Sequence, residues 1–130
     1  MLSMYINPSN KHLLSADCKG QIHHWSLNGN SGWQFNQTPY TGHSASVEDI
    51  QWQPLSDFTF SSVSVDKSIK VFDVRGGYKP QLTIENAHDN DINVMSWSRK
   101  DPNFILTGGD DCALKIWDTR SMMAGNKKHT

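Results

Sequence analysis

The chain has 130 residues, of which 36% are hydrophobic, and its 12 basic and 13 acidic residues give a formal net charge of −1. This balance argues against direct binding to nucleic acid, which requires clustered Lys and Arg. No apolar segment is long enough to span a bilayer, so no membrane partner is expected. Cys18 and Cys112 provide no disulfide framework, which favours a reducing compartment.

Short segments of alternating apolar and polar residues predict strands separated by turns. The first predicted group covers residues 2–6, 11–16, 20–25 and 33–37. The second covers 46–52, 58–64, 68–74 and 79–85, and the third covers 91–97, 104–108 and 113–117 without a convincing fourth strand. No helical periodicity is visible before residue 120, and the segment after it is too polar to classify.

A repeat organises these strands. Residues 43–75 recur as 88–120 with a constant offset of 45 and no gap, and residues 13–25 form a weaker copy of the latter half. A period in the forties that ends in an aromatic-Asp pair is typical of a β-propeller, in which each repeat forms one four-stranded blade. The sequence therefore predicts an all-β fold built from repeated antiparallel sheets.

The length of the chain limits how many blades it can form. Propellers close with roughly 4 to 8 blades of about 40 to 45 residues each, so the sequence predicts a partial, open propeller of about two and a half to three blades. The predicted parts are an incomplete first blade (1–40), a second blade (41–86), a third blade without its outer strand (87–120) and a polar tail (121–130). We expect the remaining blades in a longer parent chain; a truncated gene model or an assembly of several copies is the alternative.

Four dipeptides mark the repeats: Gly42-His43, Phe72-Asp73, Ala87-His88 and Trp117-Asp118. They resemble WD repeats, which implies a WD-repeat β-propeller. Within that superfamily, residues 17–23, 42–52, 87–99 and 108–118 are similar to the glutamate-rich WD-repeat proteins. This resemblance implies a nucleolar ribosome-assembly factor that chaperones a ribosomal protein and is related to histone-binding WD proteins.

The last copy carries a polar set at fixed intervals: His88, Thr107, Asp111 and Trp117. A hydroxyl, an imidazole and a carboxylate are also the components of a nucleophilic triad. A nucleophile must be exposed to substrate, whereas these positions fall inside one predicted blade. The carboxylate can hold one imidazole nitrogen, and the hydroxyl can link the imidazole to the indole N–H. We therefore predict a structural tetrad and no catalysis.

The middle copy offers the corresponding set His43, Ser62, Asp66 and Phe72. Phe72 has no N–H, so its predicted network ends at Ser62. The first copy has Lys19 where the Asp is expected and no corresponding His, which predicts that it is the loosest blade.

Metal binding has one candidate, Cys18 with His23 and His24. A zinc site needs three or four ligands that meet in space, and adjacent strand residues point to opposite faces. No Gly-rich phosphate loop is present. We predict no metal site and no cofactor.

Interaction surfaces remain. Residues 105–120 are similar to the box by which some WD proteins dock on the adaptor of cullin ubiquitin ligases; Arg120 is its diagnostic residue, and Arg75 repeats it. The turns on one rim supply further candidate docking residues: Ser46, Val65, Asp91 and Asp110. We predict a nuclear, nucleolar protein-interaction scaffold that binds a ribosomal protein. The alternatives are a histone-binding chaperone and a substrate receptor of a cullin ubiquitin ligase.

Overall fold

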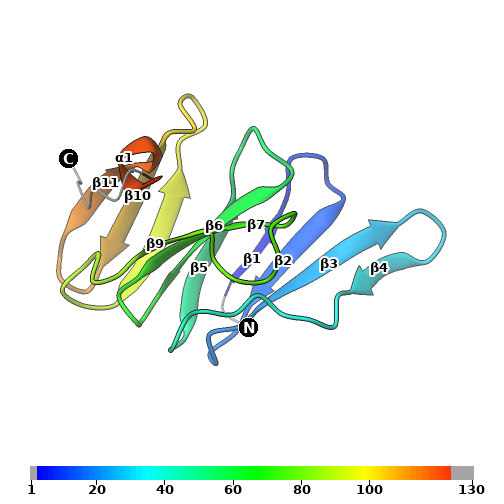
Figure 1. Cartoon of the computed structure of the whole chain (residues 1–130), viewed down its shortest axis with the longest axis horizontal. Coiled ribbons are helices and arrows are strands. Elements are labelled where there is room, and N and C mark those ends of the chain that lie inside the picture. The colour runs from blue at the N-terminus through cyan, green and yellow to red at the C-terminus, as the bar shows by residue number, and fades with distance from the viewer. Residues whose placement is uncertain (1–2, 124–130) are drawn as a thin grey trace.

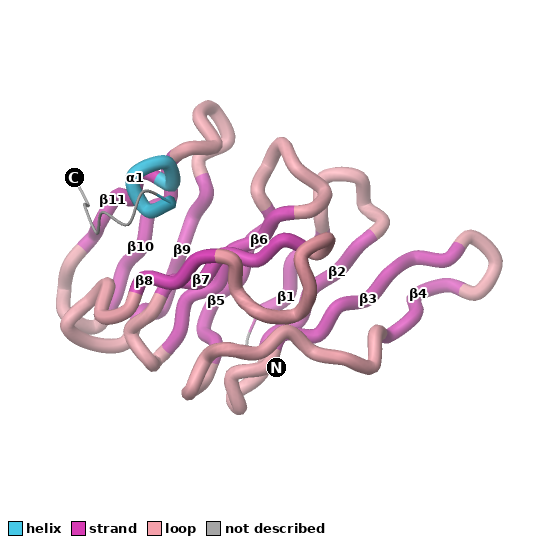
Figure 2. The backbone as a smooth tube through the Cα atoms, in the orientation of Figure 1, coloured by secondary structure: helices cyan, strands magenta, loops and turns pink. Residues whose placement is uncertain are grey.

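A computed structural model of the chain describes residues 3–123 (Figures 1 and 2). The strands are β1 (Ser3–Ile6), β2 (His12–Ala16), β3 (Ile22–Asn28), β4 (Gly32–Phe35), β5 (Val47–Trp52), β6 (Thr59–Ser64), β7 (Ile69–Asp73), β8 (Leu82–Ile84), β9 (Ile92–Trp97), β10 (Phe104–Gly109) and β11 (Leu114–Asp118). A short helix, α1 (Thr119–Met123), follows β11, and the sequence pattern did not indicate it. Most of the predicted tail at 121–130 lies outside the described residues.

The strands form three antiparallel sheets with the orders β1-β2-β3-β4, β5-β6-β7-β8 and β11-β10-β9. Each sheet is built from one continuous stretch of chain, as in repeat proteins whose units contact only their neighbours. Figure 1 shows the sheets side by side with β5 between β1 and β9, and the row does not close into a ring. The predicted all-β, partial and open propeller is confirmed.

Most strands begin and end within one or two residues of the predicted bounds, and two differ by more for local reasons. The strand predicted at 79–85 pairs with β7 only over Leu82–Ile84, because Pro80 has no N–H to give to a ladder. The strand predicted at 20–25 continues to Asn28. It forms a hairpin with β4 in which Asn28 pairs with Gly32, whose φ of 74° suits the turn.

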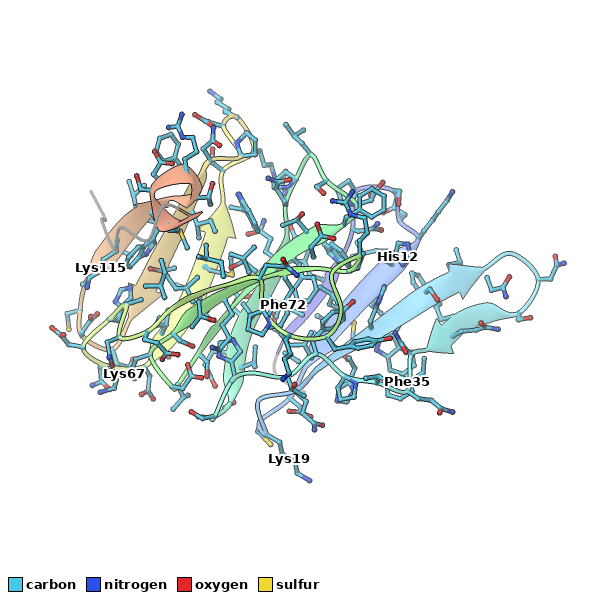
Figure 3. All side chains as sticks on the ribbon, in the orientation of Figure 1. His12, Lys19, Phe35, Lys67, Phe72 and Lys115 are labelled. Carbon is cyan, nitrogen blue, oxygen red and sulfur yellow. The ribbon has the colours of Figure 1, made fainter. Side chains whose placement is uncertain are left out.

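Two apolar cores fill the spaces between the sheets. The core between the first and second sheets contains Leu14, Ala16, Ile22, Tyr40, Val47, Ile50, Trp52, Phe60 and Phe72. The core between the second and third sheets contains Val63, Ile69, Ile84, Ala87, Ile92, Met95, Trp97, Ile105, Trp117 and Met122. Figure 3 shows Phe72 near the middle of the molecule. Alternation along each strand lets the second sheet contribute one face to each core.

Polar side chains on β5 join the innermost strands. The Asp49 carboxylate accepts hydrogen bonds from the Ser3 hydroxyl on β1 and from the Met95 backbone N–H on β9, both at 3.0 Å. Gln51 Oε1 accepts from the backbone N–H of Trp97, while its amide nitrogen donates to the tyrosine hydroxyl on β1. These bonds hold the three sheets together where they converge.

Candidate functional site

On the third sheet, four side chains form a continuous hydrogen-bonded chain. The Trp117 indole N–H donates to Thr107 Oγ1 at 2.8 Å, and that hydroxyl lies 2.7 Å from His88 Nε2. His88 Nδ1 lies 2.9 Å from each carboxylate oxygen of Asp111. A carboxylate only accepts, so Nδ1 carries the ring proton and Nε2 accepts from the hydroxyl. Every donor in this chain therefore has an acceptor.

This order of groups matches a nucleophilic triad, but the surroundings differ from those of an active site. Thr107 is 0% exposed and His88 is 1% exposed, so neither can reach a substrate. The Thr107 hydroxyl also already donates its proton to the imidazole and accepts the indole N–H. A nucleophile in use needs an open side from which a substrate can approach. The geometry supports a structural role.

The second sheet contains the same arrangement without the indole at its end. His43 Nε2 lies 2.7 Å from the Ser62 hydroxyl, and His43 Nδ1 lies 2.9 Å from Asp66. Phe72 offers no N–H and instead stacks on another core ring, with the centroids 4.9 Å apart. Sequence reasoning missed Ser68, whose hydroxyl donates to Asp66 and lies 3.1 Å from His43 Nδ1. The repeat gave no signal for it, because Ala113 occupies the corresponding position.

The aspartates of both networks are held as carboxylates. The hydrogen bond from His88 lowers the pKa of Asp111 to about 2. Burial by itself raises the pKa of Asp66, but hydrogen bonds from His43 and Ser68 bring that pKa well below its usual range. Each carboxylate also accepts the backbone N–H that follows its histidine in the chain, at 3.0 Å. They therefore fix the loops before β5 and β9 to the β6–β7 and β10–β11 turns.

The first sheet has a different network. The Trp25 indole N–H donates to the Ser15 hydroxyl at 3.1 Å, and His23 Nε2 lies 3.2 Å from Asp17. Sequence reasoning missed this Asp–His pair, because Asp17 lies two positions before Lys19, the position that corresponds to the tetrad aspartate, and His23 is not at the tetrad histidine position. The other oxygen of Asp17 accepts the Lys19 backbone N–H at 2.9 Å, which folds the β2–β3 turn around it.

The three candidate metal ligands do not converge. His23 pairs with Asp17, whereas His24 Nε2 lies 3.0 Å from His12 Nδ1. Within residues 3–123 no group of three or more His, Cys, Asp and Glu side chains could hold a metal ion. Burial, together with the neighbouring His12, lowers the pKa of His24 to about 4, so this histidine is neutral at pH 7.

The predicted rim residues form two equivalent pairs. The Val65 N–H donates to the Ser46 carbonyl at 3.0 Å, and the Asp110 N–H donates to the Asp91 carbonyl at 2.9 Å. Asp110 is exposed and Asp91 is partly exposed, and the exposed Asp89, which sequence reasoning missed, lies in the same loop as Asp91. The Ser46 hydroxyl is buried and has no hydrogen-bond partner within the described residues, so this side chain does not face solvent as predicted.

Arg75 and Arg120 occupy equivalent positions at the ends of β7 and β11. Each guanidinium binds the aspartate two residues earlier through two N–H···O bonds of 3.0 and 2.8 Å. Each also lies over a phenylalanine ring, 4.5 Å from the centroid of Phe58 for Arg75 and 5.9 Å from that of Phe104 for Arg120. Both side chains remain about two thirds exposed, at 65% and 64%. Each guanidinium is thus held in one orientation by its aspartate while most of its surface stays accessible to a partner.

Comparison with known families agrees with the repeated sheets and their networks. The model of the WD domain, G-beta repeat (WD40), matches residues 33–73 and 78–118. The chain belongs to the WD40-repeat family. Both matched WD40 repeats end on the aromatic-Asp pair of the third strand of a sheet.

Individual relatives share part of this chain. The protein HEAT STRESS TOLERANT DWD 1 of Arabidopsis thaliana is 48% identical over 71 residues, which is 55% of this chain and 15% of the relative. WD-40 repeat-containing protein MSI4 of the same plant is 38% identical over 85 residues, 65% of this chain and 17% of the relative. Ribosome assembly protein rrb1 of Schizosaccharomyces pombe is 38% identical over 91 residues, 69% of this chain and 19% of the relative. The WD40 chain thus spans less than a fifth of the length of these relatives.

Among the described residues, no helix is long and apolar enough to cross a membrane.

Proposed function

We propose that this WD40 chain is a non-catalytic protein-interaction scaffold of a nuclear, nucleolar ribosome-assembly factor that chaperones a ribosomal protein. The similarity to a protein named for ribosome assembly covers 69% of the chain and supports this assignment. The structural observation that carries it is the rim of the third sheet, formed by the loop before β9 and the β10–β11 turn. The backbone bond from Asp110 to Asp91 and the buried network of His88 and Asp111 hold this loop and this turn together. Rigid display of turns is how repeat scaffolds present a binding surface.

The charge of this rim suits a basic partner. Asp89 and Asp110 are exposed, and Asp91, whose carbonyl accepts the Asp110 N–H, is partly exposed. Proteins that bind RNA neutralise phosphates with Lys and Arg, so an unassembled ribosomal protein carries an excess of positive charge. The carboxylates of the rim can pair with those positive charges. Complementary charge also favours encounter with the correct partner and disfavours partners of like charge.

A binding assay tests the proposal. We would measure the affinity of the chain for purified basic ribosomal proteins at two salt concentrations. Replacing Asp89, Asp91 and Asp110 together by Asn should weaken binding at least tenfold, and the wild-type affinity should fall as salt rises. Asp101→Asn is the matched control, because Asp101 lies in the β9–β10 turn at the opposite end of the sheet. Equal affinities for the triple variant and the wild type would contradict the proposed surface.

The same assay separates the histone-binding alternative. Histones are also basic, so the acidic rim serves both partners, and the decision rests on selectivity. Preferential binding of histones over ribosomal proteins at equal salt would transfer the assignment to a histone chaperone.

Assays for ester, peptide and phosphate hydrolysis test the non-catalytic part of the proposal. We expect no turnover, and we expect His88→Ala to lower the melting temperature.

A substrate receptor of a cullin ubiquitin ligase is a second candidate, favoured by the fixed and exposed Arg120. An arginine anchor at the centre of an interface can contribute about 2 kcal/mol or more. Arg120→Ala should then abolish capture of the ligase adaptor, whereas Arg75→Ala, which has the same local geometry, should not. Undiminished capture by Arg120→Ala would exclude this candidate.

A further inference from the structure

Two large apolar side chains are exposed in the β5–β6 turn, which covers residues 53–58. Leu55 is 72% exposed and Phe58 is 45% exposed. The Arg75 guanidinium lies over the Phe58 ring, 4.5 Å from its centroid, so the ring is held in place while part of it stays open. The turn belongs to the second sheet, which has a neighbouring sheet on each face. Packing of a further sheet therefore does not explain why these side chains are exposed.

The repeat shows that the fold does not require the two apolar side chains. With the offset of 45, Leu55 and Phe58 correspond to Lys100 and Asn103 in the β9–β10 turn of the third sheet. Both of those residues are polar, and the third sheet forms the same antiparallel hairpin around them. The apolar pair is thus not needed to form a sheet of the WD40 family, and exposed apolar patches of this kind mark interaction sites.

A depression of about 350 Å³ lies beside the turn. Its lining includes Tyr5, Pro8, Trp52, Pro54, Leu55 and Arg99. Figure 1 shows the β1–β2, β5–β6 and β9–β10 turns, which surround it, along the upper edge of the view. Successive turns of an antiparallel sheet alternate between its two ends. The depression therefore lies on the rim opposite to the acidic one, at the end away from the β10–β11 turn.

Arg99 is the charged residue in the described lining of this depression. It is exposed, and within residues 3–123 its guanidinium has no hydrogen bond or ion pair. Arg75 and Arg120 differ, because each binds its own aspartate. A free guanidinium offers N–H donors whose geometry fits a carboxylate. The depression thus combines an apolar lining with one unused cationic group.

The carboxylates of the surrounding turns are already in use. Asp57 accepts hydrogen bonds from the Asn7 side-chain amide at 2.9 Å and from the Ser9 N–H at 3.0 Å, which joins the β5–β6 turn to the β1–β2 turn. Asp101 accepts from the backbone N–H and the side-chain amide of Asn103 and closes the β9–β10 turn. The turns are therefore fixed relative to one another, and neither carboxylate pairs with the arginine in the lining.

We propose that this rim binds an acidic peptide segment of a partner protein, with an apolar side chain of the segment in the depression and a neighbouring carboxylate on Arg99. Leu55 and Phe58 extend the apolar contact along the turn. The exposed Lys100 beside Arg99 adds a second positive charge, and complementary charge selects acidic over basic segments. This surface differs from the acidic rim in place and in sign of charge, so the inference does not depend on the proposed function.

Binding of synthetic peptides tests this surface. Fluorescein-labelled heptapeptides with a central Leu, Phe or Trp between Glu residues are titrated with the chain, and fluorescence anisotropy reports binding. Matched peptides carry Lys in place of Glu, or Ser at the centre. We expect the acidic peptides with an apolar centre to bind, and either change should weaken binding at least tenfold. Equal affinity for the Lys peptides, or no binding of any peptide at millimolar concentration, would overturn the proposal.

Variants of the chain locate the binding surface. Leu55→Ser and Arg99→Glu should each weaken binding of the acidic peptides at least tenfold, because one removes an apolar contact and the other removes the cation. Lys19→Glu is the matched control for charge, since Lys19 is exposed in the β2–β3 turn on the opposite rim, at the lower edge of Figure 3. All three side chains are exposed, so melting temperatures should stay unchanged and confirm folding. Wild-type affinity in both test variants would show that the peptides bind elsewhere.

A reversal of charge preference tests direct pairing with Arg99. The Arg99→Glu variant should bind the Lys peptides more tightly than the Glu peptides, and loss of binding without this reversal would contradict the pairing. Nucleic acid and lipid are tested on the same variants with single-stranded RNA and with phosphatidylserine vesicles. Either ligand binding more tightly than the peptides, and losing that binding in Arg99→Glu, would overturn the acidic peptide as the occupant.

Discussion

The Asp49 carboxylate on β5 accepts a hydrogen bond from the Met95 backbone N–H on β9 at 3.0 Å. Its other oxygen accepts from the Ser3 hydroxyl on β1, so one side chain joins strands of all three sheets. In the third sheet the corresponding position is Val94, which cannot make such a bond. The joint is specific to the second sheet and is not a general property of the repeat.

Asp49→Ala should therefore destabilise the whole stack. It leaves the N–H of the buried Met95 without its carboxylate partner, and an unpaired buried donor costs about 1–3 kcal/mol. Urea unfolding midpoints measure the loss. Glu48→Ala on the same strand is the control and should change the free energy of unfolding by less than about 0.5 kcal/mol. Equal losses for both variants would show that Asp49 does not join the sheets energetically.

Trp117→Phe should lower the free energy of unfolding by at least about 1 kcal/mol, the usual net contribution of one hydrogen bond. Phe keeps an apolar ring in the buried site but is smaller than the indole, so a packing loss adds to the loss of the N–H that binds Thr107. The same denaturant titration measures it. In a Thr107→Val background the substitution should cost less, because the acceptor is already absent. An unchanged midpoint for Trp117→Phe would show that the hydrogen bond from Trp117 to Thr107 does not contribute to stability.

Stability should depend on pH in two separate windows. The folded-state pKa of His24 is lowered to about 4 from 6.5, so the unfolded chain binds more protons between these values and stability falls as pH drops from 6.5 to 4. His24→Gln removes this titration and should flatten that part of the curve. Unfolding midpoints at pH 7, 5.5 and 4.5 provide the measurement. Parallel curves for variant and wild type would contradict the assignment to His24.

The second window lies at lower pH and comes from the carboxylates. The folded-state pKa values of Asp66 and Asp111 lie below the ordinary 3.8. Their contribution is therefore complete above pH 3.8 and is lost as pH falls through the folded-state values. Asp111→Asn should reduce stability at neutral pH and weaken the dependence below pH 3.8, while the slope between pH 4 and 6.5 stays as in the wild type.

Gly20→Ala should be the most damaging of three glycine substitutions. Gly20 has φ of +83°, and an added Cβ would lie 2.6 Å from the His43 carbonyl oxygen. Gly32 has φ of +74° but open space around it, so Gly32→Ala should cost only the backbone strain of about 1–2 kcal/mol. Gly29→Ala, with nothing nearby, sets the baseline. Melting temperatures in a different order would contradict the close contact between the β2–β3 turn and the loop before β5.

The sequence alone predicted the strands and their grouping into sheets, and it named the histidine and aspartate positions that hydrogen bonds connect in the second and third sheets. The reason is physical: alternation with period two and turn residues act locally, and the repeat places His88 relative to Asp111 as it places His43 relative to Asp66. The sequence did not predict the roles of Ser68 and of the Asp17–His23 pair. These residues are not repeated at the equivalent positions of the other copies, so the repeat gave no signal for them.

The tertiary structure decided everything that depends on contacts between sheets. Residues 49 and 95 lie on different repeats, and nothing in either local pattern states that a carboxylate on one strand will meet a backbone N–H on another. The burial of the Ser46 hydroxyl and the low pKa of His24 likewise follow from what packs over them. Alternation shows that a strand has two faces; only the packing of neighbouring sheets determines which face is covered and which stays open.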